Sequence, residues 1–178
     1  MIEVEAKIKI QNPKEFRKLV NQLGKLVEKE EKIDDYYTLQ KNKSYPRKSL
    51  RIRKKNGIHE INFKERISYK NGIHAKNEQE FQVTDINNFL ALIADFGFKK
   101  WLTKIKHSEI YELKNNFHIE INHVKSLGWF LEIEYLTEKN KIEKARKEIQ
   151  EIIKKLSIEK NQIIREGYTK MLWDKSGK

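Results

Sequence analysis

The sequence predicts an α+β protein in which eight antiparallel strands close into a β-barrel or tunnel, with helices packed on its outside. Many segments alternate apolar and charged residues, as strands with one apolar and one charged face do. Short turn sequences, among them Asn56-Gly57 and Leu127-Gly128, separate consecutive segments as in β-hairpins. Three amphipathic helices each need an apolar sheet face to cover, which places the charged strand faces inside the barrel.

The first half of the chain contains five of the predicted strands and one helix. The helix begins at Asn12-Pro13, because proline favours the first helical position, and it ends at Gly24. A basic loop is expected at residues 40–48 and a second loop, containing Asn71-Gly72, after the fourth strand. The expected strands are residues 2–10, 26–39, 49–55, 58–65 and 78–83.

The second half completes the barrel and adds the remaining helices. Asp85 is expected to cap a helix that Gly97 ends. The following strands are predicted at residues 98–113, 117–124 and 129–136, and two more helices at residues 142–156 and 168–173. We expect a single domain over residues 1–173 and a short C-terminal tail at residues 174–178.

Composition limits the classes of function. The chain has 178 residues, a net charge of +12 and a pI of about 9.6, a balance that favours polyanionic partners. It has no cysteine, which excludes disulfides and thiolate chemistry. No apolar stretch approaches the roughly 20 residues of a membrane span, so we expect a soluble, cytoplasmic protein that does not bind membranes.

The opening strand carries the most informative pattern. Glu3, Glu5 and Lys7 share one face, because alternate residues of a strand point the same way. Two carboxylates at this spacing can share a divalent cation, and the lysine can hold the anion that this cation binds. Alone, the pattern also fits an ordinary strand with one solvated face.

The same pattern recurs on other strands, with cations on some and carboxylates on others. Buried like charges are costly unless a ligand neutralises them. A polyphosphate would satisfy the cations and a divalent metal the carboxylates, so the repeated pattern favours a ligand-binding lumen. The further residues of this pattern are Arg51, Arg53, Lys64, Glu78, Glu80, Lys104, Lys106, Glu132 and Glu134.

Several of these residues lie in motifs that together resemble the CYTH superfamily, the triphosphate tunnel metalloenzymes. The resemblance spans almost the whole chain, and its motifs occur in the family's order. They are Glu3-x-Glu5-x-Lys7, Asp34-x-Tyr36-Tyr37, Leu50-Arg51-Ile52-Arg53, Asn62-Phe63-Lys64, Glu78-x-Glu80, Lys104-x-Lys106, Leu127-Gly128-Trp129-Phe130-Leu131-Glu132-Ile133-Glu134 and Gly167-Tyr168 with Met171-Leu172.

The resemblance implies an eight-stranded tunnel that binds a triphosphate together with Mg²⁺ or Mn²⁺, and it implies a role for each motif residue. The implied catalytic residues are Glu3, Glu5, Lys7 and Glu134. The implied phosphate ligands are Lys7, Arg51, Arg53, Lys64, Lys104 and Lys106. The implied metal ligands are Glu3, Glu5, Glu132 and Glu134, with Asn122 as a weaker candidate, and the supporting residues are Glu78, Glu80 and Glu120.

Two positions depart from the family pattern. Asn122 stands where the family usually has an aspartate, and an amide offers a metal an oxygen but no charge and cannot serve as a general base. Lys106 replaces an arginine, which removes a bidentate grip on phosphate.

The resemblance favours a class IV adenylyl cyclase-like enzyme that converts ATP to cyclic AMP and pyrophosphate. The first alternative is a triphosphatase acting on inorganic triphosphate, thiamine triphosphate or a nucleoside triphosphate. The second is a polyphosphate- or nucleic-acid-binding module without catalysis. We expect a nucleoside triphosphate or inorganic polyphosphate as partner rather than nucleic acid, and a homodimer is compatible with the prediction.

Overall fold

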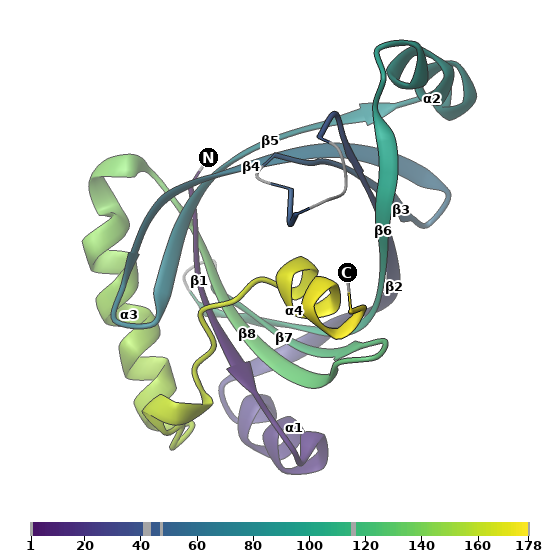
Figure 1. Cartoon of the computed structure of the whole chain (residues 1–178). Coiled ribbons are helices and arrows are strands. Elements are labelled where there is room, and N and C mark those ends of the chain that lie inside the picture. The colour runs from purple at the N-terminus through teal and green to yellow at the C-terminus, as the bar shows by residue number, and fades with distance from the viewer. Residues whose placement is uncertain (1, 41–43, 47, 115–116, 178) are drawn as a thin grey trace.

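Eight antiparallel strands form a closed barrel in the computed structural model, which describes residues 2–40, 44–46, 48–114 and 117–177, without the side chains of residues 64–66. The order around the barrel is β1-β5-β4-β3-β2-β6-β7-β8, and β8 pairs with β1 to close the ring (Figure 1). Closure leaves no unpaired sheet edge. The predicted antiparallel barrel is therefore confirmed.

Most elements lie within a few residues of their predicted bounds. The strands are β1 (Ile2–Lys9), β2 (Gly24–Thr38), β3 (Leu50–Lys55), β4 (Ile58–Lys70), β5 (Ile73–Val83), β6 (Lys99–Leu113), β7 (Phe117–Val124) and β8 (Gly128–Thr137). The α-helices are α1 (Pro13–Asn21), α2 (Ile86–Asp95), α3 (Ile142–Lys155) and α4 (Tyr168–Lys175), and short 3₁₀ turns occupy Lys139–Lys141 and Lys160–Gln162.

The hairpin between β4 and β5 differs from the prediction. The loop expected between residues 65 and 78 is absent, because β4 continues to Lys70 and β5 begins at Ile73. Asn71 and Gly72 have φ values of 51° and 82°, which are the positive angles of a two-residue hairpin turn. The turn sequence thus joins two long strands directly, and it brings Lys76 into the barrel wall.

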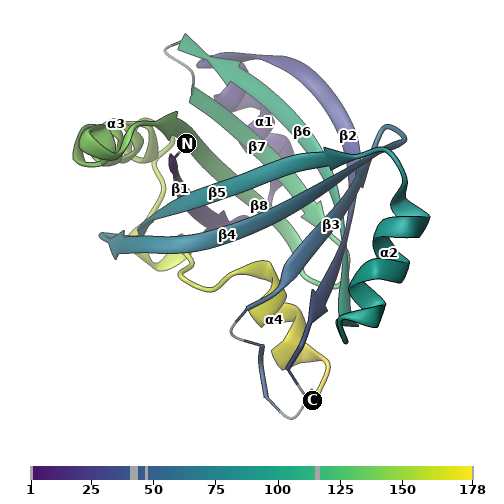
Figure 2. The same cartoon turned by 90° about the horizontal axis from the view of Figure 1, so that it is seen from above.

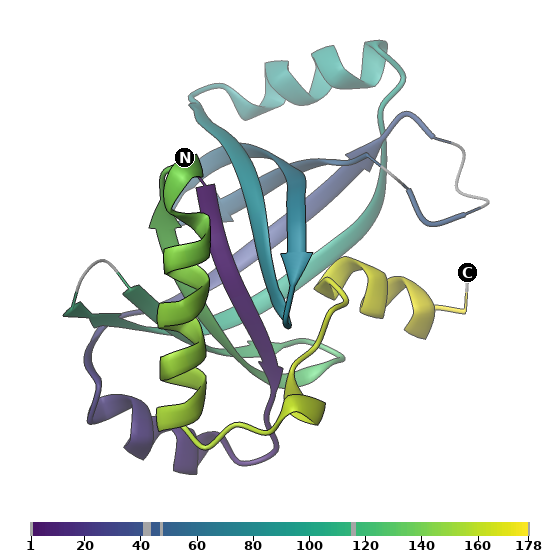
Figure 3. The same ribbon diagram turned by 90° about the vertical axis from the view of Figure 1, so that its left-hand side faces the viewer.

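The apolar core lies between the outer face of the barrel and the helices. Ile8, Ile119 and Ile133 on the strands are fully buried together with Ala145 and Ile149 of α3. Helix α3 runs along β1 (Figure 3), and α1 packs near β2 and β7. Helix α2 covers a second cluster on the other side of the barrel (Figure 2), where Ile93 meets Ile52 and Ile61.

Helix α4 lies at one end of the barrel (Figure 1), and its first residue, Tyr168, faces the barrel interior. The ring of Tyr168 is buried against Phe130, with centroids 4.9 Å apart. Lys7 and Lys104 lie on the same tyrosine ring, with Nζ at 4.3 Å and 5.4 Å from its centroid. The helix continues to Lys175, two residues into the predicted tail. Among the described helices, none is long and apolar enough to cross a membrane.

Candidate active site inside the barrel

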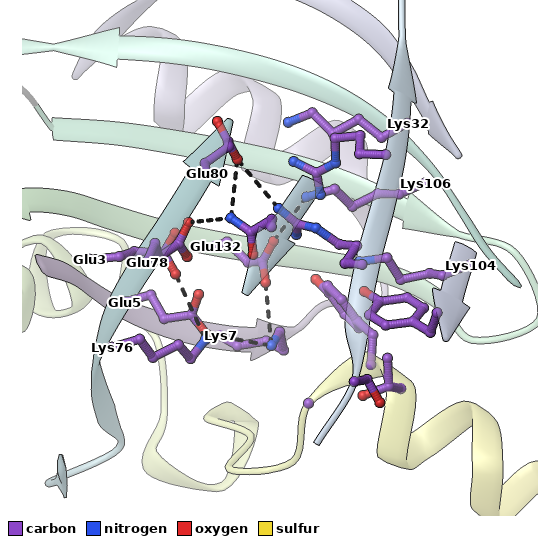
Figure 4. Close-up of a pocket in the computed structure, with 18 of the residues that line it drawn as sticks. Glu3, Glu5, Lys7, Lys32, Lys76, Glu78, Glu80, Lys104, Lys106 and Glu132 are labelled. Carbon is purple, nitrogen blue, oxygen red and sulfur yellow. Dashed lines mark hydrogen bonds and ion pairs between the residues drawn. The ribbon is translucent and has the colours of Figure 1, made fainter. Parts of the chain in front are cut away.

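The barrel encloses a charged cavity of about 620 Å³ whose walls come from all eight strands, from the start of α4 and from residues 45–46. Figure 4 shows Glu3, Glu5, Glu78 and Glu80 on one side of this space with Lys7 and Lys76 beside them, and Lys32, Lys104 and Lys106 on the other side. The charged residues of the pattern thus point inward while the apolar ones pack under the helices, as the alternation predicts.

Strands β1 and β5 place two carboxylates beside two lysines. Glu3 and Glu5 are buried on β1, and Lys76 of β5 bridges them, with Nζ hydrogen-bonded to Glu5 and 3.7 Å from Oε1 of Glu3. Lys7 lies 3.7 Å from Glu5 and 3.3 Å from Glu132. Burial alone would lower the pKa of Lys7, but the charges of Glu5 and Glu132 outweigh it and raise this pKa.

Strands β6, β7 and β8 form the adjoining wall, since β8 pairs with β1. Nζ of Lys106 donates to Glu120 at 2.5 Å and to Glu132 at 3.3 Å. The Nδ2 of Asn122 donates to the same two carboxylates at 3.1 Å and 2.7 Å. Burial would raise the pKa of Glu120, but Lys106 and Lys32 hold it well below its usual range. This wall is therefore a closed network of charged and polar groups.

Glu134 lies between these two walls. Its burial and the charges of Glu120 and Glu132 raise its pKa to about 8. Two sets of three carboxylates share this residue, and within each set one oxygen per residue lies within 4.8 Å of the others: Glu3, Glu5 and Glu134, and Glu120, Glu132 and Glu134. Clustered carboxylate oxygens are the ligands that Mg²⁺ and Mn²⁺ favour, so the donor set fits such an ion.

A third cluster surrounds Asp34 of β2, which is fully buried. Arg53 donates Nε and Nη2 to its two oxygens at 2.7 Å and 3.0 Å, and Lys104 lies 2.8 Å away. Burial would raise the pKa of Asp34, but Lys104 and Arg53 hold it well below its usual range. Nearby, Nη2 of Arg51 lies 3.7 Å from Glu80, and its buried Nε finds no hydrogen-bond partner among the described residues.

Aromatic side chains border the cavity next to α4. Trp101 packs against Tyr36 and Tyr45, with ring centroids 6.1 Å and 5.7 Å apart. The hydroxyl groups of Tyr45 and Thr169 lie 2.8 Å apart, which ties residues 45–46 to α4. Nζ of Lys104 is 5.8 Å from the centre of the Tyr36 ring, so this aromatic border directly adjoins the cations of the interior.

The structure gathers the predicted site residues into one cavity. Those that line it are Glu3, Glu5, Lys7, Arg51, Arg53, Glu78, Glu80, Lys104, Lys106, Glu120, Glu132 and Glu134. Asn122 is buried between Glu120 and Glu132 and offers them its nitrogen, while its Oδ1 has no hydrogen-bond partner among the described residues. Lys64 pairs with Glu78 in the β4–β5 ladder, and its side chain lies outside the described part of the chain.

Sequence reasoning left four charged residues of the interior out of the site. Lys32 donates to Glu120 at 2.9 Å and lies 2.6 Å from Glu30, and Lys76 bridges Glu3 and Glu5. Asp34 had been noted only as part of a motif. The signal was present, because Glu30, Lys32, Asp34 and Tyr36 alternate along β2 as the charged residues of the other strands do.

Comparison with known proteins agrees with this geometry. The CYTH domain model matches residues 1–168. A protein of Methanocaldococcus jannaschii named "Putative adenylate cyclase MJ0240" is 30% identical, over 96% of this chain and 98% of that relative. The solved structure of PH1819 from Pyrococcus horikoshii is 28% identical with a TM-score of 0.81, covering 97% of this chain and 99% of that one.

A more distant structure shares the fold alone. It is titled "Putative adenylyl cyclase HpAC1 from Hippeastrum reveals a dominant triphophatase activity" and is 14% identical, with a TM-score of 0.66 over 99% of this chain and 96% of that one. The family model covers nearly the whole chain, and the barrel carries the family's charged interior. The chain therefore belongs to the CYTH domain family, whose members process triphosphates.

Proposed function

We propose that this protein is a divalent-metal-dependent enzyme that binds a nucleoside triphosphate in the barrel and converts it, as a class IV adenylyl cyclase does, to a cyclic nucleotide and pyrophosphate. The aromatic border of Tyr36, Tyr45 and Trp101 beside the cations of the interior is the observation that favours a nucleoside triphosphate as the substrate. A nucleobase can stack on such rings while its phosphates extend inward. The name of the M. jannaschii relative also supports this proposal.

The phosphates would meet the cations closest to the aromatic border first. Arg51 has a buried Nε that no described residue satisfies, and Lys104 lies beside it in the Asp34 cluster. Arg53 commits two N–H groups to Asp34, so it positions that carboxylate and adds charge rather than gripping phosphate with both. Lys7 and Lys76 also line the cavity, where they can neutralise the charge that develops on a leaving pyrophosphate.

The carboxylates of Glu3, Glu5 and Glu134 are the groups that would hold Mg²⁺ or Mn²⁺. When bound, such an ion stabilises negative charge on the phosphates. In cyclisation the ribose 3′-hydroxyl would attack the α-phosphorus, give its proton to a carboxylate of the cavity or to water, and displace pyrophosphate as the bond between the α- and β-phosphates breaks. The barrel supports this step by holding the phosphate chain in line among its cations.

A triphosphatase remains the second candidate, because the same cations and carboxylates serve a water molecule that attacks the terminal phosphorus. The shared fold of the Hippeastrum protein, whose title assigns it a triphosphatase activity, is consistent with this alternative. The two reactions differ in which end of the phosphate chain lies beside the metal ligands. Product analysis therefore separates them where the fold does not.

The test is product analysis with ATP and with inorganic triphosphate, each with Mg²⁺ and with Mn²⁺. We expect cyclic AMP and pyrophosphate from ATP. A Glu5→Gln variant is expected to lose at least about a hundredfold in rate, because it removes a metal ligand that also holds Lys76 and Lys7. Gln82→Glu, an exposed change on β5, is the control that should leave the rate unchanged.

Other outcomes would replace the proposal. Orthophosphate release from either substrate, lost in Glu5→Gln, would make the protein a triphosphatase. Tight triphosphate binding without any product would leave a binding module. Salt-sensitive binding of single-stranded nucleic acid without need of metal would support the nucleic-acid alternative.

A further inference from the structure

A row of polar side chains crosses the inner face of the barrel from β2 to β5. Tyr36 of β2 is opposite Arg51 of β3, and Arg51 is opposite Asn62 of β4. Asn62 is in turn opposite Glu80 of β5, and all of these residues line the cavity. The row therefore joins the aromatic border at Tyr36 to the carboxylates of β5.

The neighbours of Asn62 fix the orientation of its amide. Its Nδ2 donates to Oε2 of Glu78 at 3.2 Å and to Oε2 of Glu80 at 3.1 Å. Because an ionised carboxylate only accepts hydrogen bonds, the amide must present its nitrogen to this pair and turn its oxygen away from it. Asn62 is 1% exposed, and its Oδ1 has no hydrogen-bond partner among the described residues. A buried acceptor without a partner is costly, so this oxygen is placed to accept a hydrogen bond from a bound ligand.

The next position in the row has the complementary group. Nε of Arg51 is buried and finds no hydrogen-bond partner in the described part of the chain. Its Nη2 lies 3.7 Å from Glu80 and its Nη1 lies 4.0 Å from Asp34. An N–H donor and a carbonyl acceptor thus occupy directly opposite positions of β3 and β4. A hydroxyl group can satisfy both, because its oxygen accepts one hydrogen bond while its hydrogen donates another.

A phosphate group cannot satisfy Asn62 in this way. An ionised phosphate offers acceptors only, so it has no hydrogen to donate to Oδ1. Glu78 and Glu80, which hold the amide and border the same space, would also repel a phosphate (Figure 4). The surroundings of Asn62 therefore favour an uncharged hydrogen-bond donor that lies next to the phosphates.

We propose that Asn62 recognises a ribose hydroxyl of the bound nucleotide, with Oδ1 accepting the hydroxyl hydrogen and Nε of Arg51 donating to the hydroxyl oxygen. The ribose joins the base to the phosphates, and this pair lies in the row that begins at Tyr36 of the aromatic border. The guanidinium of Arg51 has further N–H donors on its Nη atoms, which serve the phosphates. Asn62 is thereby a specificity-determining residue that favours a nucleoside triphosphate over inorganic triphosphate. This inference rests on the nucleotide substrate of the proposed function.

The test measures dissociation constants by calorimetry for ATP, 2′-deoxy-ATP, 3′-deoxy-ATP and inorganic triphosphate, with Ca²⁺ in place of Mg²⁺ to slow turnover. Chromatography of the recovered ligands checks that they are intact. We expect the unmodified protein to bind one of the two deoxynucleotides about tenfold more weakly than ATP, because Oδ1 and Nε lose their partner. In Asn62→Ala this preference should fall to about twofold or less, while the affinity for inorganic triphosphate stays within about twofold.

Two controls accompany the test. Gln79→Ala removes an amide from the exposed position between Glu78 and Glu80, and it is expected to leave every dissociation constant unchanged. Inosine triphosphate lacks the amino group of adenine and is expected to bind as ATP does. Weaker binding of inosine triphosphate, together with equal binding of ATP and both deoxynucleotides, would mean that Asn62 recognises the base and would overturn the inference. Circular dichroism and thermal unfolding check that each variant is folded.

The remaining outcomes separate this inference from the proposed function. Equal binding of all the nucleotides to the unmodified protein would overturn the inference, as would an unchanged preference for ATP in folded Asn62→Ala, and cyclic AMP formation would leave the proposed function standing in either case. Inorganic triphosphate bound without any binding of ATP would overturn the proposed function itself. If Asn62→Ala does not fold, Arg51→Lys keeps the charge but lacks Nε, and a preference for ATP that is unchanged in this variant would equally overturn the inference.

Discussion

The two faces of the barrel use the same strands for different purposes. The outer face, under α1, α2 and α3, is apolar, and residues such as Ile8, Ile119 and Ile133 are fully buried there. The inner face buries charged residues to a similar extent, and Asp34 and Glu120 carry pKa values held well below the usual range by neighbouring cations. The outer face can be stabilised by packing alone, whereas the inner face depends on charge balance.

This difference teaches where a ligand can act. A triphosphate and its metal would add charges only to the inner face. Ligand binding should therefore raise the unfolding free energy of an inner-face charge variant by more than it raises that of the unmodified protein. It should raise the unfolding free energy of an outer-face variant by the same amount as that of the unmodified protein. The two faces can therefore be told apart by measuring the unfolding free energy with and without ligand.

Removing the charge of Asp34 is expected to have the largest effect on stability. Asp34→Asn leaves Arg53 and Lys104 buried without a carboxylate, which should lower the unfolding free energy by about 3–5 kcal/mol. Inorganic triphosphate should restore more stability to this variant than to the unmodified protein, because its oxygens can replace the missing partner. Chemical denaturation with and without triphosphate measures both quantities, and equal stabilisation of the two proteins would contradict the expectation.

An outer-face variant of comparable burial gives the matched case. Ile133→Ala removes a fully buried side chain from the cluster under the helices and should lower the unfolding free energy by about 3 kcal/mol. Triphosphate should stabilise this variant by the same amount as it stabilises the unmodified protein. A larger restoration in the same denaturation experiment would mean that the two faces are not energetically separate.

The pH dependence of stability sharpens the comparison further. The pKa of Asp34 is lower in the folded chain than the ordinary value near 4, so its pairs stabilise the fold fully above that value and lose this effect as the pH falls toward the folded pKa. The difference in unfolding free energy between the unmodified protein and Asp34→Asn should therefore shrink below about pH 4. The difference for Ile133→Ala should stay constant, and denaturation curves at pH 3 and pH 7 compare them.

The sequence predicted the barrel and most of its interior because both depend on a period-two pattern. Alternation on β1, β3, β5, β6 and β8 placed Glu3, Arg51, Lys104 and Glu134 in one cavity before any pairing was known. The order of strands around the ring and the cross-strand pairs could not be read in this way, since they depend on tertiary contacts.

The misses have specific physical causes. Lys76 was placed in a loop because an Asn-Gly pair was treated as part of a longer connection, although it can turn a hairpin in two residues. Lys32 and Glu30 were missed because residues 26–39 were predicted as a strand without attention to the alternation of its charged residues. The double bridge of Asn122 between Glu120 and Glu132 needed coordinates, because the sequence gives the amide but not which of its atoms faces the carboxylates.

The smallest effect on stability is expected when an ion pair on the outer surface is removed, because water can take the place of the lost partner. Arg17 of α1 donates Nε to Glu109 at 2.7 Å and Nη2 at 3.1 Å, and it lies over the ring of Trp129. Both side chains are partly exposed, so Arg17→Ala should lower the unfolding free energy by at most about 1 kcal/mol, and by less in high salt. Lys154→Ala, which breaks a more exposed pair with Glu151, should cause no measurable change. A loss for Arg17→Ala as large as that for Asp34→Asn would show that burial in the barrel is not what makes the inner charges matter.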